Sequence, residues 1–157
     1  MGVHTATIRW TRNAQAPATD FTASRYSRAH AWMFDGGTTV PASASPHNVP
    51  AGTADRAGVD PEEAFVAAVS SCHMLWFLAL AAKRGLVVEQ YHDEADGVLE
   101  RDTDGVQRMT RVTLRPHITW GGTPPDAATV SAVHDAAHHA CYIANSIRST
   151  VTIAPVA

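Results

Sequence analysis

One long apolar segment with a helix start signal before it and a helix stop signal after it dominates this sequence. Asp60 is a natural N-cap, Pro61 suits the first helical position, and Glu63 stands where it completes a capping box. The segment Ala64–Ala82 is apolar almost all round, and Gly85 follows it as a stop signal. The pattern predicts a helix that is buried on most sides and forms the centre of the core.

Size and composition indicate one ordinary globular domain over residues 1–157. Hydrophobic residues make up 45% of the chain and charged residues 17%, which excludes disordered and fibrous classes. The net charge of -3 and the absence of a basic run argue against a nucleic-acid partner. The apolar segment has membrane-spanning length, but it is rich in alanine and broken by polar residues, so we expect no membrane partner.

The remaining secondary structure is predicted from alternation, turn signals and caps. The expected strands are 5–10, 22–34, 87–91, 95–101, 106–120 and 149–155, the second helix is 127–140, and 35–58 is a long loop. Asp102 to Gly105 reads as the turn of a hairpin between two of these strands. Antiparallel strands with two segregated helices predict an α+β fold.

Two cysteines, Cys72 and Cys141, are the residues most suited to chemistry. The start of the chain carries no visible export signal, so we expect a cytoplasmic protein in a reducing environment. A lasting structural disulfide is improbable there, and each cysteine is then a core residue, a catalytic group or a metal ligand.

The neighbourhoods of the two cysteines resemble those of a known family. Residues 60–72, with a Pro-Glu pair and an Ala-rich run before Cys72, resemble the central helix of the OsmC and organic hydroperoxide resistance (Ohr) proteins. Residues 138–146 resemble the second cysteine segment of that family, although Tyr142 stands where many relatives have proline. The resemblance implies an OsmC-like α+β fold, with the first cysteine on the long central helix and a second helix before the second cysteine. It also implies an intertwined homodimer with active sites at the interface.

The resemblance further implies a thiol peroxidase that acts on organic hydroperoxides. Peroxide would oxidise Cys72 to a sulfenic acid, and Cys141 would resolve it as an intramolecular disulfide. The enzyme would need no cofactor or metal, only a small dithiol or a dithiol protein as reductant. A cysteine thiol needs a nearby positive charge to form a reactive thiolate. Cys72 is too far from the N-terminus of its helix for the helix dipole to stabilise that thiolate.

The family supplies this charge with an arginine from the N-terminal strands and a glutamate from the start of the central helix. Glu62 matches the glutamate, and we select Arg28 over Arg25 because Arg28 shares its predicted strand face with aromatic residues. Glu62 and Cys72 would be about 15 Å apart along one helix, so we expect Arg28 and Glu62 to serve the partner's thiol.

A pocket for bulky peroxides is predicted around the first thiol, and two residues are expected to orient the second. The predicted pocket residues are His73, Met74, Trp76 and Phe77, and those beside the second thiol are Tyr142 and Asn145. Backbone capping is an equal explanation for Asn145.

Three other functions compete with the peroxidase. His134, His138 and Cys141 could bind zinc together with Cys72 and His73. A cysteine hydrolase is disfavoured because such nucleophiles usually sit at a helix start. A non-catalytic dimeric binding module is the third alternative.

Overall fold

The structure is a computed structural model that describes residues 2–156. Contacts divide it into two compact units, one ending at Ala64 and the other beginning at Phe65. The single domain over 1–157 stays a prediction. The architecture is α+β, with mainly antiparallel sheets and helices grouped apart from them, as the sequence predicts.

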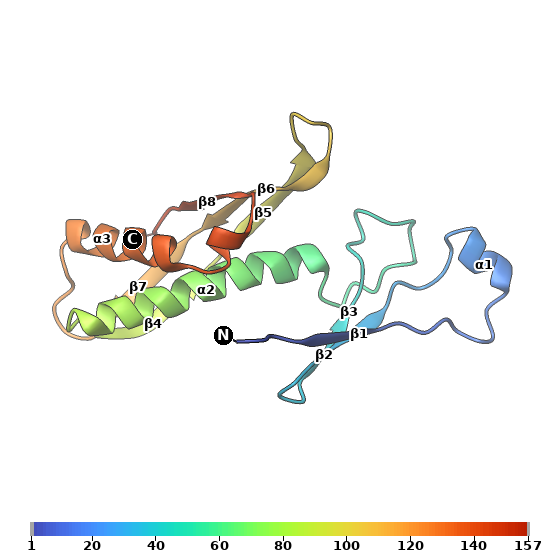
Figure 1. The fold of residues 1–157 in the computed structure, drawn as a ribbon, viewed down its shortest axis with the longest axis horizontal. Helices are drawn as coiled ribbons and strands as arrows, with labels where there is room; N and C mark the ends of the chain where they lie inside the picture. Colours follow the sequence, from blue (N-terminus) through green and yellow to red (C-terminus); the bar gives the residue numbers. More distant parts are fainter. Residues whose placement is uncertain (1, 157) are drawn as a thin grey trace. The chain divides into compact units, whose positions relative to one another are not determined.

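The N-terminal unit is built around a small antiparallel sheet (Figure 1). Its strands are β1 (Ala6–Arg9), β2 (His30–Phe34) and β3 (Thr39–Ala42), in that spatial order. A short helix, α1 (Ala18–Thr22), lies in the excursion between β1 and β2.

The predicted strand over 22–34 is wrong in its first part, because only residues 30–34 are extended in the sheet. Ser24 has a positive φ of 58°, and the Arg25 N–H bonds the Asp20 carbonyl, so the chain turns here. Tyr26 and Arg28 do share a side, but as a stacked pair: the Arg28 guanidinium lies 3.8 Å from the Tyr26 ring centroid. The alternation before His30 therefore does not mark a strand.

The predicted loop over 35–58 contains a strand that the prolines and glycines concealed. β3 pairs with β2, and Pro41 lies opposite Ala31 in the register. Proline is tolerated at such an edge, and Ala42 forms a parallel bridge with Val59 on the other side. The loop proper therefore begins after Ala42.

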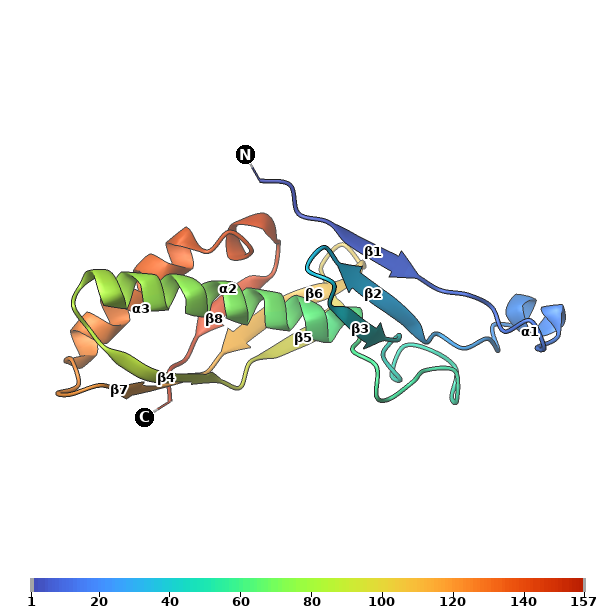
Figure 2. The ribbon, with the colours of Figure 1, turned by 90° about the horizontal axis from the view of Figure 1, so that it is seen from below.

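The C-terminal unit consists of two helices on one side of two small sheets, as Figures 1 and 2 show. α2 (Pro61–Lys83) starts at the boundary between the units, and α3 (Ala127–Ala140) precedes a 3-10 turn, η1 (Ala144–Ser146). The strands are β4 (Val88–Asp93), β5 (Asp96–Arg101), β6 (Gln107–Leu114), β7 (Pro116–Trp120) and β8 (Thr150–Ile153). The spatial orders are β4-β7 and β5-β6-β8.

Both helix starts follow from their sequences. The Asp60 carboxylate accepts from the Glu63 N–H at 2.8 Å, and Glu63 accepts from the Asp60 N–H at 3.0 Å, which confirms the predicted capping box. At the second helix the Asp126 carboxylate accepts from the Thr129 N–H at 2.7 Å. Local signals thus fix where both helices begin.

The single strand predicted over 106–120 is two strands in different sheets. Pro116 has no N–H to continue a ladder, and the Arg115 N–H bonds the Asp93 carboxylate at 2.6 Å instead of a neighbouring strand. A second departure from the expected antiparallel order is β8, which pairs with β6 in parallel.

The expectation that α2 is buried on most sides is wrong for the single chain. Its fully buried residues are Val69, His73, Phe77 and Ala81, which repeat every four positions and form one stripe. Leu75, on another side, is 61% exposed. By length and composition alone α2 could cross a membrane, a test that core helices also pass.

Gly97 lets α2 lie close to the sheet, because a Cβ at this position would overlap Val66 of the helix and the Met109 side chain of β6. We expect Gly97→Ala to lower the free energy of unfolding by about 1–3 kcal/mol, since overpacking forces neighbours to move. Urea denaturation measures this. Gly36→Ala, where nothing lies within 4 Å, is the control. Equal stability of both variants would contradict the close approach.

Candidate active site

The two cysteines meet in the C-terminal unit. Cys72 lies in the middle of α2 and is half-buried, whereas Cys141 is fully buried at the C-cap of α3. Both are free thiols, and Cys72 is near enough to Cys141 to raise the pKa of the Cys141 thiol. The structure thus brings together two sulfurs that are far apart in the sequence.

The Cys141 thiol is held by burial and by the backbone that follows it. Burial raises the pKa of Cys141, and the neighbouring Cys72 thiol adds to this rise. The N–H of Ala144, 3.4 Å from Cys141 Sγ, donates to the sulfur and acts in the opposite direction. Burial is the larger effect, so Cys141 favours its neutral form.

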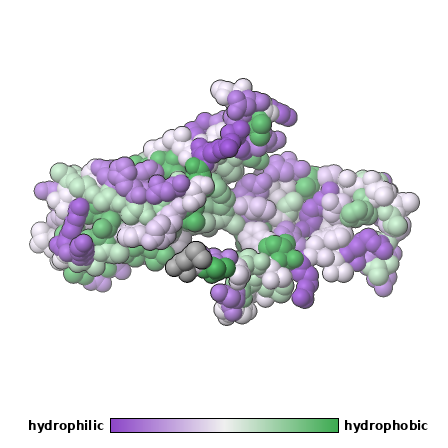
Figure 3. All heavy atoms as spheres, viewed as in Figure 1, coloured by the Kyte–Doolittle hydropathy of each residue, from purple (hydrophilic) through white to green (hydrophobic). Residues whose placement is uncertain are grey.

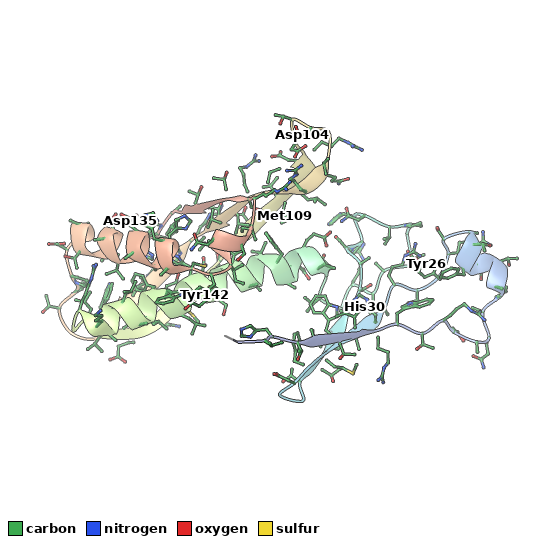
Figure 4. The ribbon with its side chains drawn as sticks, in the orientation of Figure 1. Tyr26, His30, Asp104, Met109, Asp135 and Tyr142 are labelled. Carbon is green, nitrogen blue, oxygen red and sulfur yellow. The ribbon has the colours of Figure 1, made fainter. Side chains whose placement is uncertain are left out.

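The two residues predicted to orient the second thiol have different roles. Asn145 donates from its side chain to the His139 carbonyl at 2.9 Å, so its side chain caps the end of α3. Tyr142 points outward, 69% exposed, with its ring edge on Trp76 at a centroid distance of 5.4 Å. Figure 4 labels Tyr142 beside α2.

An apolar hollow of about 300 Å³ opens beside the first thiol. Its lining residues are Cys72, Leu75, Trp76, Ala79 and Tyr142. Of the predicted pocket residues on α2, only Trp76 lines this hollow. Leu75 and Ala79 were missed, although their spacing of three and seven from Cys72 puts them on its side of a helix.

His73 and Phe77 lie in the core of the C-terminal unit, where burial removes them from the hollow. Each is at most 1% exposed, and Phe77 packs against Val133 and Ala137 of α3. His73 Nε2 is 3.0 Å from His134 Nδ1. Met74 is half-buried and does not line the hollow.

The buried histidines stay neutral at physiological pH. Burial lowers the pKa of His73 to about 4, with help from His134 and His138. Burial also lowers the pKa of His134 to about 4, against the opposing effect of Asp135 and Asp93. Desolvation of the charged imidazole is the dominant cause in both.

The residues proposed as zinc ligands do not form a metal site in the structure. Within residues 2–156, no group of three or more histidine, cysteine, aspartate or glutamate side chains is arranged to hold a metal ion. His134 Nδ1 is hydrogen-bonded to His73 and is not directed at the cysteines. The ligand set that the sequence suggested is therefore not brought together.

Arg28 and Glu62 belong to the N-terminal unit, and each has a partner there. Nη1 of Arg28 donates to the carbonyls of Ser24 at 2.9 Å and Tyr26 at 2.6 Å. Glu62 accepts from the Asn48 side chain at 3.3 Å. Their action on the thiols stays a prediction. Arg25 forms a salt bridge with Asp20 at 2.8 Å.

Fold and thiols together define an α+β dithiol protein. The chain belongs to the OsmC family, because the family model described as OsmC-like protein matches residues 52–155. Among curated proteins none matches.

Solved structures agree with the family assignment. An OsmC-like protein of unknown function from Vibrio cholerae is 46% identical, with a TM-score of 0.94 over 99% of this chain and 100% of that one. The organic hydroperoxide resistance protein OhrB of Bacillus subtilis is 21% identical, with a TM-score of 0.63 over 96% of each chain. An organic hydroperoxide resistance protein from Legionella pneumophila is 17% identical, with a TM-score of 0.65 over 99% of this chain and 97% of that one. The last two share the fold.

Proposed function

We propose that this protein is a thiol-dependent peroxidase that reduces organic hydroperoxides. The observation that supports this most directly is that Cys72 and Cys141 are neighbours, with Cys72 opening onto an apolar hollow. Membership of a family that includes hydroperoxide-resistance proteins supports the same reaction.

In the proposed reaction Cys72 is the attacking thiol. Its thiolate attacks one peroxide oxygen, the O–O bond breaks, and the alkoxide leaves and takes up a proton to become an alcohol. Cys72 is then a sulfenic acid. Cys141 is the poorer first nucleophile, because burial raises its pKa and keeps it protonated.

Cys141 resolves the sulfenic acid. Its sulfur attacks the sulfur of Cys72, the S–S bond forms, and the sulfenic oxygen leaves as water with the thiol proton. An external dithiol, either a small molecule or a protein, then returns two electrons and two protons. The proposed enzyme uses no metal or other cofactor.

The activating charge is proposed to come from a second copy of the chain. In a cytoplasmic homodimer, Arg28 and Glu62 of one chain would serve Cys72 of the other, with arginine favouring the thiolate. Exposed apolar residues beside the thiol, Leu75 and Tyr142, support a partner on this side. In Figure 3 apolar residues also gather over the region of α2 and α3.

The deciding experiment treats the reduced protein with cumene hydroperoxide, counts free thiols and maps any disulfide by mass spectrometry. We expect both thiols to be lost to one Cys72–Cys141 bond within a chain. Thiols that stay reduced in excess peroxide would remove the proposed function and leave the fold intact.

Trp76 is proposed to select for bulky substrates. We expect Trp76→Ala to lower kcat/KM for cumene hydroperoxide about tenfold, since losing buried aromatic contact costs about 1–2 kcal/mol. Activity with hydrogen peroxide, which cannot fill the hollow, should change little. Val87→Ala, at another exposed apolar position, is the control. Equal losses on both peroxides would show that the hollow does not select the substrate.

A further inference from the structure

A hydrogen-bonded histidine pair is buried between α2, which carries Cys72, and α3, which ends at Cys141. His73 on α2 is 1% exposed and His134 on α3 is 3% exposed. Their facing nitrogens are 3.0 Å apart, and the ring planes differ by only 5°. This is a direct polar contact between α2 and α3, next to the apolar core residues Phe77, Ala81, Val133 and Ala137.

Burying this pair in the core lowers the stability of the fold compared with apolar residues of similar size. The outer nitrogens, His73 Nδ1 and His134 Nε2, are buried and have no hydrogen-bond partner among the described residues. Each unsatisfied buried polar group costs about 1–3 kcal/mol, and apolar replacement of a bonded pair can be neutral or stabilising. Packing with Phe77, whose ring centroid is 4.3 Å from that of His134, would be served as well by a leucine.

The position of the pair suggests what it does. His73 directly follows Cys72, so one side chain faces the core while the other faces the hollow. His134 lies two turns before Cys141 and on the same side of α3. A bond between these histidines therefore fixes how far α2 is rotated against α3. The same rotation changes the direction in which the Cys72 side chain leaves α2.

We propose that His73 and His134 are positioning residues of the dithiol: their hydrogen bond sets the rotation of α2 against α3 and so keeps the two sulfurs within bonding reach. The inference deepens the proposed function, on which it rests for the use of Cys72 and Cys141 as a redox pair. Neither histidine is assigned a contact with the peroxide.

The test is the equilibrium of the protein with glutathione, which needs no peroxide. The protein dithiol and one glutathione disulfide give the protein disulfide and two glutathiones, so two electrons and two protons pass to glutathione. The equilibrium constant reports how well the fold holds the sulfurs together. In the double variant His73→Leu and His134→Leu we expect this constant to fall about tenfold or more, since a disulfide held away from its preferred geometry is strained and more easily reduced.

Two further variants separate positioning from core filling. Val133→Ala weakens the same helix contact without touching the histidine bond, and it should lower the Tm but leave the glutathione equilibrium unchanged. His134→Asn keeps a bonding group at the Nδ1 position and should recover most of the loss. A double leucine variant that folds with the parent's equilibrium constant would overturn the inference, as would an equal fall in Val133→Ala. Failure of the peroxide reaction alone would leave this result standing.

Discussion

Cys72→Ser is expected to abolish hydroperoxide reduction, with a fall in kcat/KM of at least about a thousandfold, because a serine hydroxyl is a far weaker nucleophile than a thiolate. The substitution replaces sulfur by oxygen at a half-buried position of α2, so the fold should persist. Steady-state assays with cumene hydroperoxide and a dithiol reductant measure the loss, and circular dichroism checks the helix content.

Cys141→Ser is the matched variant, since it removes the other sulfur of the proposed pair. It should still consume about one peroxide per chain in a single turnover and stop with a sulfenic acid on Cys72, which dimedone traps. The two variants thus separate attack from resolution. Full turnover by Cys72→Ser, or a sulfenic acid on Cys141 in the parent protein, would contradict the proposed order of roles.

Acid should destabilise the fold through its buried histidine pair. Folding lowers the pKa of His73 and of His134 from 6.5 to about 4, so the unfolded chain binds more protons between these pH values. The free energy of unfolding is then highest above pH 6.5, falls as the pH drops toward 4, and levels off below that. The expected loss is about 3 kcal/mol for one such histidine, and less than twice that for two bonded neighbours.

Urea denaturation at pH 7 and at pH 4.5 measures this loss. Carboxylates also titrate in this range, so the informative quantity is the difference between the parent and the double variant His73→Leu and His134→Leu. The variant should lose several kcal/mol less than the parent between the two pH values. The same acid sensitivity in both proteins would show that other groups control it.

Helices were predicted from the sequence better than strands, because helix ends carry local chemical signals. Asp60 and Glu63 formed the predicted capping box, and α3 covers the expected 127–140. Strand limits depend on partners far away in the chain. Alternation in 22–34 could not distinguish an extended strand from the Arg28–Tyr26 stack, and β3 was hidden by a proline tolerated at a sheet edge.

Residue type alone pointed to the cysteines of the candidate site, whereas the residues that line the hollow depend on the geometry of the helix. Because the chain has only two cysteines, Cys72 and Cys141 could be singled out from the sequence, and the structure makes them neighbours. The pocket prediction chose neighbours in sequence, including His73 and Phe77, and a helix turns such neighbours to opposite sides. Counting three, four and seven positions from Cys72 finds the lining residues Leu75, Trp76 and Ala79.

The placement of the two sulfurs gives them unequal mechanical freedom. Cys72 is anchored at the middle of a 23-residue helix, whereas Cys141 stands where α3 gives way to an irregular segment that leads to β8. Movement needed to close or open a disulfide should therefore be taken up by the segment after Cys141. Oxidation of the two thiols should then change amide hydrogen exchange over residues 142–149, with little change along α2.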